Sequence, residues 1–162
     1  MEKVKILSLI SGIITLTATF LFTLFTYTLA GKTYYVSGLL GTSRIIHMMF
    51  APYSVAYILS IIVLLIFLFS GALQILGFKF KSLAFLGSVL PLFFSLVIIL
   101  SVLGLPVQYL GALYILGGDE PIIDGILPLN VSFANSQISL GAYLLLISSI
   151  IGIISSLIKR GG

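Results

Sequence analysis

Four long apolar segments, separated by shorter polar ones, dominate the hydrophobic pattern of the chain. A helix that crosses about 30 Å of hydrocarbon needs about 20 apolar residues, because each residue adds about 1.5 Å. Segments of that length cover about 6–30, 53–78, 83–105 and 139–158, and none of them contains Asp, Glu, Lys, Arg or His. Lipid cannot satisfy a spare backbone N–H or C=O group, so we expect these segments to be helical. The pattern predicts an all-α integral membrane protein, with one four-span helix bundle over residues 1–162.

The first segment also has the basic start of a secretory signal peptide, because Lys3 and Lys5 precede it. Its apolar region is about twice as long as the apolar region of such a signal. We therefore interpret it as a true membrane span.

The basic residues predict an orientation. One side of the predicted bundle has six of them: Lys3, Lys5, Lys79, Lys81, Lys159 and Arg160. The other side has only Lys32 and Arg44. Basic residues favour the cytoplasmic side of a membrane. We therefore expect both termini in the cytoplasm, with outer loops over 31–52 and 106–138 in a multi-pass protein of the cell membrane.

Composition agrees with a lipid environment. Of the 162 residues, 60% are hydrophobic and 7% are charged, whereas a soluble domain has about 25% charged residues. The net charge of +4 follows from the orientation and indicates no nucleic-acid partner. The chain has no cysteine, which excludes disulfides, thiolate metal sites and thiol redox chemistry. Few thermolabile residues are present, as in heat-adapted proteins.

Small and hydroxyl residues recur at helical spacing in the predicted spans. Such residues mark contacts between helices in lipid, where no hydrophobic effect drives association. The predicted packing positions are Gly12, Thr15, Thr19, Thr23, Gln74, Pro91, Ser148, Gly152 and Ser156. Pro91 has no N–H for the Gly87 carbonyl, so we expect a kink there. An alternative is that the threonine stripe lines a path in an oligomeric channel or carrier, although no ionisable group accompanies it.

The first outer loop contains the only histidine, His47. Thr42 or Ser43 could cap a short helix that extends to Phe50. Arg44 and His47 would then share one face of a helix lying at the membrane interface. The alternatives are that His47 binds haem or a metal, with a second ligand from a partner subunit, or that it makes a pH-responsive contact.

The third loop, 106–138, has two extended apolar runs around Gly117, Gly118 and Pro121. This pattern predicts a short β-hairpin, with the segment TYYVS of the first loop as a possible third strand. Asn130 begins the sequence Asn-Val-Ser, a possible glycosylation site. The acidic residues Asp119, Glu120 and Asp124 lack the spacing of a calcium loop, so we interpret them as a solvated turn.

Four spans with internal termini and a large first outer loop resemble the plan of claudin-type tetraspan proteins. The tryptophan and cysteine signature of that family's first outer loop is absent, because the chain contains neither residue. The resemblance therefore assigns a role to no residue.

No nucleophile–base pair, phosphate loop or metal motif is present in the sequence, so we predict no catalytic or metal-binding residues and no cofactor. We expect a non-catalytic membrane protein that acts by association with lipids and with other membrane subunits or copies of itself. It would be a structural or accessory subunit, or a self-assembling surface protein. The alternatives are a small subunit of a membrane redox complex, in which His47 or a cleft between helices contacts haem or quinone, and an oligomeric channel or carrier.

Overall fold

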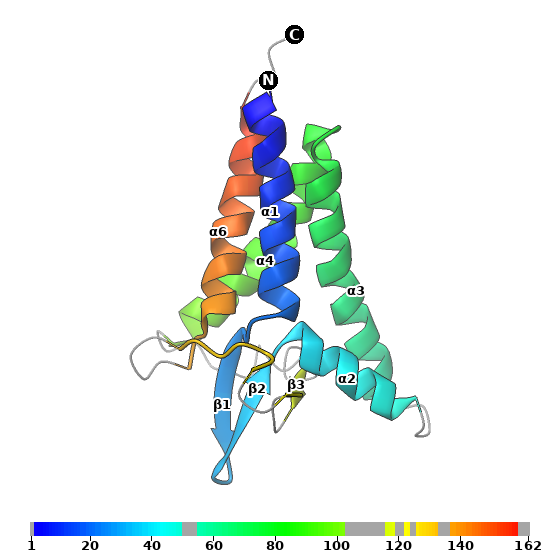
Figure 1. Cartoon of the computed structure of the whole chain (residues 1–162), viewed down its shortest axis with the longest axis vertical. Helices are drawn as coiled ribbons and strands as arrows, with labels where there is room; N and C mark the ends of the chain where they lie inside the picture. The colour runs from blue at the N-terminus through cyan, green and yellow to red at the C-terminus, as the bar shows by residue number, and fades with distance from the viewer. Residues whose placement is uncertain are drawn as a thin grey trace.

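A computed structural model describes residues 2–49, 55–102, 116–118, 122–123, 126–132 and 137–158. The chain forms a helix bundle with a small sheet and one further helix at one end (Figure 1). The elements, in chain order, are α1 (Glu2–Phe20), β1 (Phe25–Leu29), β2 (Lys32–Val36), α2 (Gly38–Met48), α3 (Val55–Leu76), α4 (Lys81–Val102), β3 (Gly117–Gly118) and α6 (Leu140–Leu157).

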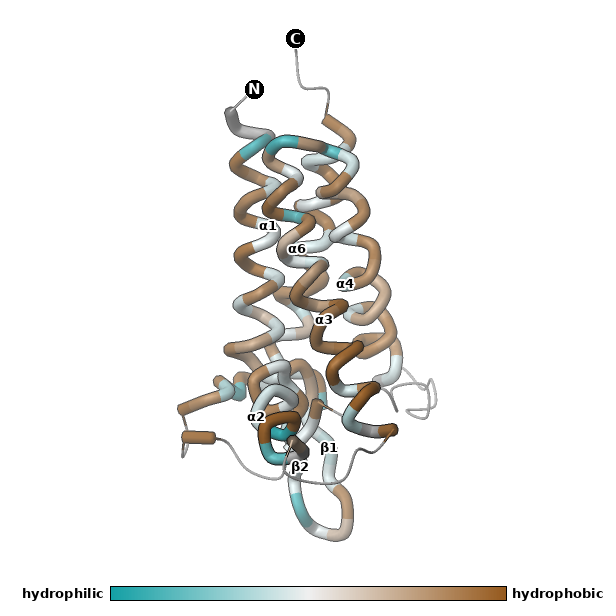
Figure 2. The backbone as a smooth tube through the Cα atoms, turned by 90° about the vertical axis from the view of Figure 1, so that its right-hand side faces the viewer, coloured by the Kyte–Doolittle hydropathy of each residue, from teal (hydrophilic) through white to brown (hydrophobic). Residues whose placement is uncertain are grey.

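The bundle consists of α1, α3, α4 and α6, which lie side by side along the long axis of the molecule (Figures 1 and 2). α1 packs against α3 and α6, and α4 packs against the same two helices. Three helices, α3, α4 and α6, are long and apolar enough to cross a membrane. The apolar part of α1, Lys5–Phe20, is shorter than the length needed by the same measure.

The surface of the bundle is apolar and its interior is rich in hydroxyl groups. Large exposed side chains are found along the whole of α3, including Ile58, Leu65 and Phe69. Serine and threonine side chains in contrast are fully buried between the helices, among them Ser11, Thr15 and Ser148. Figure 2 shows most hydrophilic positions near the two ends of the bundle. A soluble protein has the opposite arrangement, so the structure suggests a membrane protein.

The prediction that the first helix continues to residue 30 is wrong. α1 ends at Phe20, and the chain then forms the hairpin β1–β2 in place of the last turns of the predicted helix. Alternating threonines and aromatic residues favour a strand here. Ala30 and Gly31 have φ values of 50° and 79°, and positive φ at both central residues is characteristic of the two-residue type I′ turn that joins strands.

The sheet is antiparallel, with the strand order β1-β2-β3. β2 contains the predicted TYYV strand, and the third loop adds β3, where Gly118 faces Tyr35. The predicted hairpin within the third loop lies largely outside the described residues, which leave out 106–115 and 119–121, so it stays a prediction. In the described part of this loop, Ile123 and Leu127 form one antiparallel bridge. The acidic residues Asp119, Glu120 and Asp124 lie outside the described residues.

The short helix of the first loop is present but begins earlier than predicted. Its N-cap is Ser37, whose hydroxyl oxygen accepts a hydrogen bond from the Leu40 amide at 3.1 Å. The predicted caps Thr42 and Ser43 lie inside α2 instead. Ser37 follows β2 directly, so the cap turns the chain from strand to helix within one residue.

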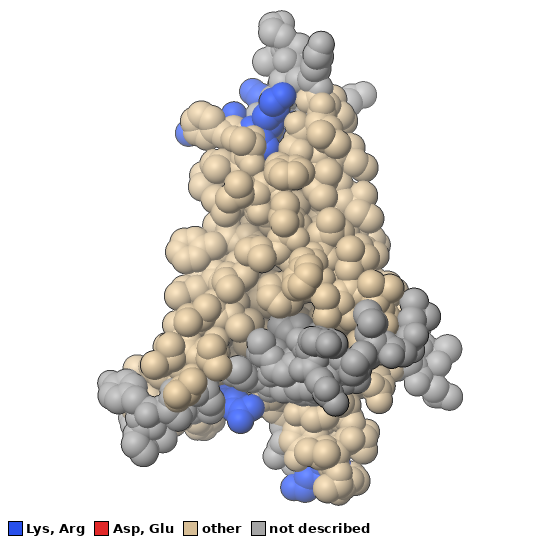
Figure 3. All heavy atoms as spheres, turned by 180° about the vertical axis from the view of Figure 1, so that it is seen from behind, with Lys and Arg blue, Asp and Glu red and all other residues tan. Residues whose placement is uncertain are grey.

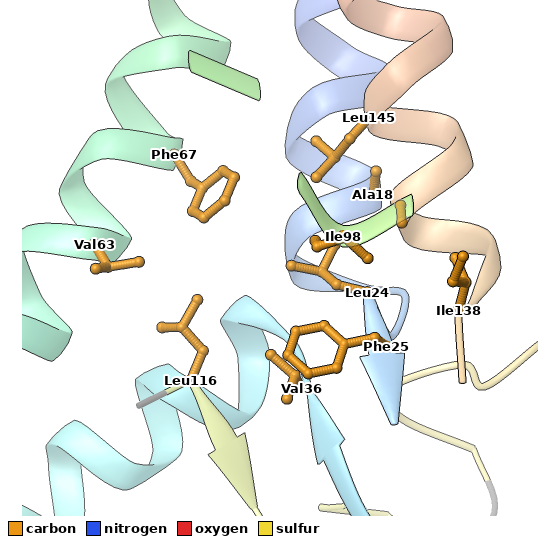
Figure 4. Packing of buried hydrophobic residues seen from close by; sticks show 11 residues of the cluster. Ala18, Leu24, Phe25, Val36, Val63, Phe67, Ile98, Leu116, Ile138 and Leu145 are labelled. Atoms are coloured by element: carbon orange, nitrogen blue, oxygen red, sulfur yellow. The ribbon is translucent and has the colours of Figure 1, made fainter. Parts of the chain in front are cut away.

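An apolar core fills the junction between the bundle and the sheet (Figure 4). It combines Phe67 of α3, Ile98 of α4 and Leu145 of α6 with Phe25 of β1 and Val36 of β2. Backbone bonds strengthen the same junction, because the Leu24 amide donates to the Val36 carbonyl at 2.8 Å and the Ser139 amide donates to Leu24 at 3.1 Å. The sheet is therefore fixed to the bundle by packing and by hydrogen bonds.

Candidate functional site

A group of buried hydrogen-bonding side chains connects all four helices of the bundle. We call it the polar seam, and its members are Ser8, Ser11, Thr15, Gln74, Ser88 and Ser148. All six side chains are fully buried. Such groups are stable in an apolar interior only when their hydrogen bonds are satisfied.

Gln74 lies at the centre of the polar seam. Its Nε2 donates to the Gly87 carbonyl and to the Ser88 hydroxyl, both at 3.1 Å. Its Oε1 accepts from the Thr15 hydroxyl at 2.6 Å. Because a carbonyl can only accept, the bond to Gly87 identifies which end of the amide is the nitrogen. Both N–H groups and the oxygen of the amide therefore have partners, on α1 and on α4.

The Gly87 carbonyl would be unpaired in an ordinary helix with proline at position 91. Pro91 stands four residues later and has no N–H to donate. Gln74 of the neighbouring helix supplies the missing donor. Pro91 is itself buried in the bundle. A neighbouring side chain that satisfies a freed carbonyl is the condition under which proline is tolerated inside a membrane helix.

Hydroxyl groups extend the seam to α6. The Thr15 and Ser148 hydroxyls are 2.9 Å apart. Each hydroxyl also has a second acceptor, Gln74 Oε1 for Thr15 at 2.6 Å and the Leu145 carbonyl for Ser148 at 2.9 Å, so either oxygen can be the donor in this pair. The Ser11 hydroxyl donates to the Ser148 carbonyl at 2.8 Å, and the Ser8 hydroxyl donates to the Gln74 carbonyl at 2.5 Å. α1 thus bonds to α6 and to α3 over two successive turns.

Glycines allow the helices to approach closely around the seam. A Cβ atom at Gly12 would lie 2.7 Å from the Gly71 carbonyl oxygen, and one at Gly87 would lie 2.6 Å from the Ser70 carbonyl oxygen. At Gly152 it would overlap the Ser88 hydroxyl. These positions have no room for a side chain, which is the use of small residues at helix interfaces.

Other predicted packing residues are also buried, in different surroundings. The Thr19 hydroxyl donates to the Thr15 carbonyl of its own helix at 2.8 Å. Ser156 donates to Ile153 at 2.6 Å, again within its helix. Thr23 lies beyond the end of α1 and donates to the Asn130 Oδ1 at 2.8 Å. The hydroxyl groups of Thr15, Thr19 and Thr23 therefore all donate to acceptors within the chain.

Asn130, the predicted glycosylation site, joins the third loop to the bundle. Its Oδ1 also accepts from the Ser139 hydroxyl, the residue before α6, at 3.1 Å. The residue is exposed. A glycan would be attached to the amide nitrogen, the atom opposite the bonded oxygen, so the possibility of modification stays a prediction.

A pocket lies at the sheet end of the molecule. We call it the sheet-end pocket, and it has a volume of about 630 Å³. Its lining is Tyr27, Tyr34, Leu40, Ser43, Arg44, His47, Gly117, Gly118 and Ile122. This volume is within the range of small-molecule sites, about 300–1,000 Å³. The pocket joins the hairpin, α2 and the third loop.

The sequence-predicted pair Arg44 and His47 lies on the wall of this pocket. Arg44 Nη1 donates to the Gly117 carbonyl at 3.3 Å, which links α2 to β3. The Tyr27 and Tyr34 rings stack across the hairpin with centroids 4.9 Å apart. Among the described residues, no three His, Cys, Asp or Glu side chains come together as a metal site.

Basic side chains gather at the two ends of the bundle, with an uncharged belt between them (Figure 3). Lys79 lies in the turn between α3 and α4, and Lys81 is the first residue of α4. Lys5 in α1 places its Nζ 5.5 Å from the centre of the Phe78 ring. Lys32 and Arg44 belong to the sheet end. We call the end of the bundle that carries Lys5, Lys79 and Lys81 the basic end.

Sequence reasoning missed Ser11, Ser88 and the stacked tyrosines. A signal for the α3–α4 contacts was available in the short turn between these helices. Gln74 lies six residues before Phe80, and Gly87 lies six residues after Lys81. Antiparallel helices joined by a tight turn place such positions at the same depth, so Gln74 could have been matched with Gly87 and Ser88. No comparable signal identifies the partners from α1 and α6.

Comparison with known proteins gives no further assignment, because no family model, curated protein or solved structure matches this chain.

Proposed function

We propose that the chain is a four-span protein of the cell membrane, with α1 as the fourth span and both termini in the cytoplasm. α1 has 19 residues, which make a helix about 28 Å long, close to the thickness of the hydrocarbon core. It packs along α3 and α6, both of which are long enough to cross. Its polar side chains face these neighbours and not the lipid.

The distribution of charge supports this orientation. Lys5, Lys79 and Lys81 lie at the basic end, and the sequence adds Lys3, Lys159 and Arg160 close to the two termini. The sheet end has Lys32 and Arg44. The positive-inside rule places the basic end in the cytoplasm and the sheet outside.

We further propose that the protein acts by association at its sheet end, as an accessory or structural subunit or as a self-assembling surface protein. The observation that supports this proposal is that polar and aromatic side chains line an open pocket at the sheet end, whereas the polar side chains of the bundle are buried. Within the described bundle, the seam hydroxyls and Gln74 bond to one another. At the sheet end, Arg44, His47, Tyr27 and Tyr34 line an open pocket. Tyrosine and arginine are enriched among the residues that contribute most to binding at protein contacts.

Two measurements test this proposal. The first uses the absence of native cysteine: a membrane-impermeant maleimide added to intact cells should label Lys32→Cys and not Lys79→Cys. Labelling of Lys79→Cys from outside would overturn the orientation.

The second measurement determines the mass of the protein extracted in native lipid discs. We expect the protein mass in each particle to exceed the 17.4 kDa of one chain. The double variant Arg44→Ala, Tyr34→Ala should shift this mass toward that of the single chain, whereas Gln137→Ala, an exposed change outside the pocket, should not. Wild-type particles that contain one chain and no other protein would refute association.

The pocket also supports one alternative from a different class, a small subunit of a membrane redox complex. His47 lies on a wall of ligand-sized dimensions beside two tyrosines, and a partner subunit could supply a second axial ligand to haem. A visible absorption spectrum of the complex purified in native lipid tests this alternative. A haem band that is lost in His47→Ala would support it, and the absence of both chromophore and extractable quinone would remove it.

A further inference from the structure

A second hollow in the structure, far from the sheet, lies at the basic end. It has a volume of about 310 Å³ and is formed where α4 begins and α6 ends. We call it the basic-end groove, and its lining is Lys81, Ser82, Phe85, Leu86, Ser156 and Leu157. Neither the polar seam nor the association proposed for the sheet end uses it.

The walls of the groove are almost entirely apolar, and the two polar residues that border it, Lys81 and Ser82, are exposed at its mouth. Lys81 and Ser82 belong to the first turn of α4, and Phe85 and Leu86 follow one turn later, about 6 Å deeper along the helix. Leu157 of α6 is 71% exposed and Leu86 is 62% exposed, so both walls are accessible from the side. The Ser156 hydroxyl donates to the Ile153 carbonyl of its own helix. Apart from its mouth, the groove offers hydrocarbon contacts.

This order of polarity matches a phospholipid. Given the orientation proposed above, the mouth lies at the level of the cytoplasmic head groups, and the apolar walls face the acyl chains. A lysine at this depth extends its ammonium group toward the head groups while its stem stays against apolar atoms. The next residue, Ser82, is also exposed and carries a hydroxyl group that can donate.

Charge selects among phospholipids. The basic end has Lys5, Lys79 and Lys81 in the described structure, and Lys159 and Arg160 follow the end of α6 in the sequence after one further residue. The sequence places one acidic residue near this end, Glu2. Clusters of basic residues on the cytoplasmic side of membrane helices favour anionic lipids, by about 1 kcal/mol per lysine or arginine.

We propose that the basic-end groove binds one anionic phospholipid of the cytoplasmic leaflet. Its phosphate accepts from Lys81 and Ser82, and one acyl chain lies against Phe85 and Leu157. This inference depends on the membrane orientation in the proposed function and not on the association at the sheet end. The lipid would fill the groove between the ends of α4 and α6, two helices that pack against each other.

The test compares phosphatidylglycerol with phosphatidylcholine on the full chain purified in detergent. Native mass spectrometry measures how much of each lipid stays bound, at equal chain length and concentration. We expect one phosphatidylglycerol to be retained in preference to phosphatidylcholine. Lys81→Gln should weaken that retention about fivefold, the change that corresponds to about 1 kcal/mol. Lys81→Arg, which keeps the positive charge, should retain phosphatidylglycerol as well as the wild type does.

Lys32→Gln is the matched control, because it removes one lysine from the sheet end. It should leave the retention of phosphatidylglycerol unchanged. Equal losses in Lys32→Gln and Lys81→Gln would show attraction to the net charge alone and overturn the proposed site. Equal retention of the two lipids by the wild type would overturn it as well.

A third comparison separates the head group from the acyl chains. Inorganic phosphate and glycerol phosphate should not displace the bound phosphatidylglycerol, since neither contacts the apolar walls. Displacement by either at millimolar concentration would mean that the site binds a free phosphate. The maleimide labelling and the particle mass are measured separately, so a failure of the orientation or of the association is distinguishable from a failure to bind lipid.

Discussion

The side-chain amide of Gln74 donates to the backbone carbonyl of Gly87, the carbonyl that Pro91 leaves without a partner in α4. One side-chain amide of α3 thereby supplies the hydrogen bond that the Gly87 carbonyl cannot form within α4. The same amide accepts from Thr15, and Thr15 is bonded to Ser148, so a proline in α4 is accommodated by a chain of contacts that reaches α6. The stability of the bundle should therefore depend on Gln74 more than on any exposed polar residue.

Replacing Gln74 with leucine should destabilise the bundle by roughly 2 kcal/mol. The change removes three interhelical hydrogen bonds, and each such bond contributes about 0.6 kcal/mol on average inside a membrane protein. It also leaves the Gly87 carbonyl buried without a donor. Reversible unfolding in detergent measures the loss. The control is Gln137→Leu, at an exposed position, which should change stability by less than about 0.5 kcal/mol; equal effects of the two changes would contradict the role of Gln74.

Gln74 and Pro91 should be energetically coupled although they belong to different helices. In Pro91→Ala, residue 91 regains an N–H that can bond to the Gly87 carbonyl within α4. The loss caused by Gln74→Leu should then be smaller, by about 0.5–1 kcal/mol, in the Pro91→Ala background than in the wild type. A double-mutant cycle of unfolding free energies measures this difference. Strict additivity of the two changes would mean that the Gly87 carbonyl does not connect them.

Gly12→Ala should separate α1 from α3. The new Cβ would lie 2.7 Å from the Gly71 carbonyl oxygen and 2.9 Å from the Ile75 amide nitrogen, both backbone atoms that cannot rotate away. We expect a loss of about 1–3 kcal/mol, as in other overpacked sites. Gly118→Ala is the control, because the nearest atom to its Cβ would be 3.5 Å away. A variant at position 12 as stable as the one at position 118 would show that the two helices do not approach so closely.

Ala30→Asn should stabilise the hairpin. Ala30 has a φ of 50°, in a region that costs an alanine about 1–2 kcal/mol and that asparagine tolerates better. With Gly31 it would form the Asn-Gly pair favoured in type I′ turns. We expect slower amide hydrogen exchange in β1 and β2, by a few-fold, and a gain of roughly 0.5 kcal/mol. Thr28→Asn, in the strand, should give no such gain. Faster exchange in Ala30→Asn would contradict the turn geometry.

Three helices could be predicted from the sequence because their apolar runs are uninterrupted. Predicted spans at 53–78, 83–105 and 139–158 correspond to α3 (Val55–Leu76), α4 (Lys81–Val102) and α6 (Leu140–Leu157). In lipid the backbone must satisfy its own hydrogen bonds, so a long apolar run has little choice but a helix. The hydroxyl and glycine positions of these helices were also visible as a periodic pattern, although the pattern alone does not say which helix each one faces.

The tertiary structure decided where the first helix ends and which polar groups meet. Residues 21–30 are as apolar as the helix before them, and they form a strand because β2 and residues 137–139 supply hydrogen-bonding partners. Those partners are distant in the sequence, so no local pattern shows that they are available. The same holds for Thr15 and Ser148, 133 positions apart. Composition and periodicity determine the helices of this protein, whereas only the packing of distant segments determines the sheet, the seam and the pocket.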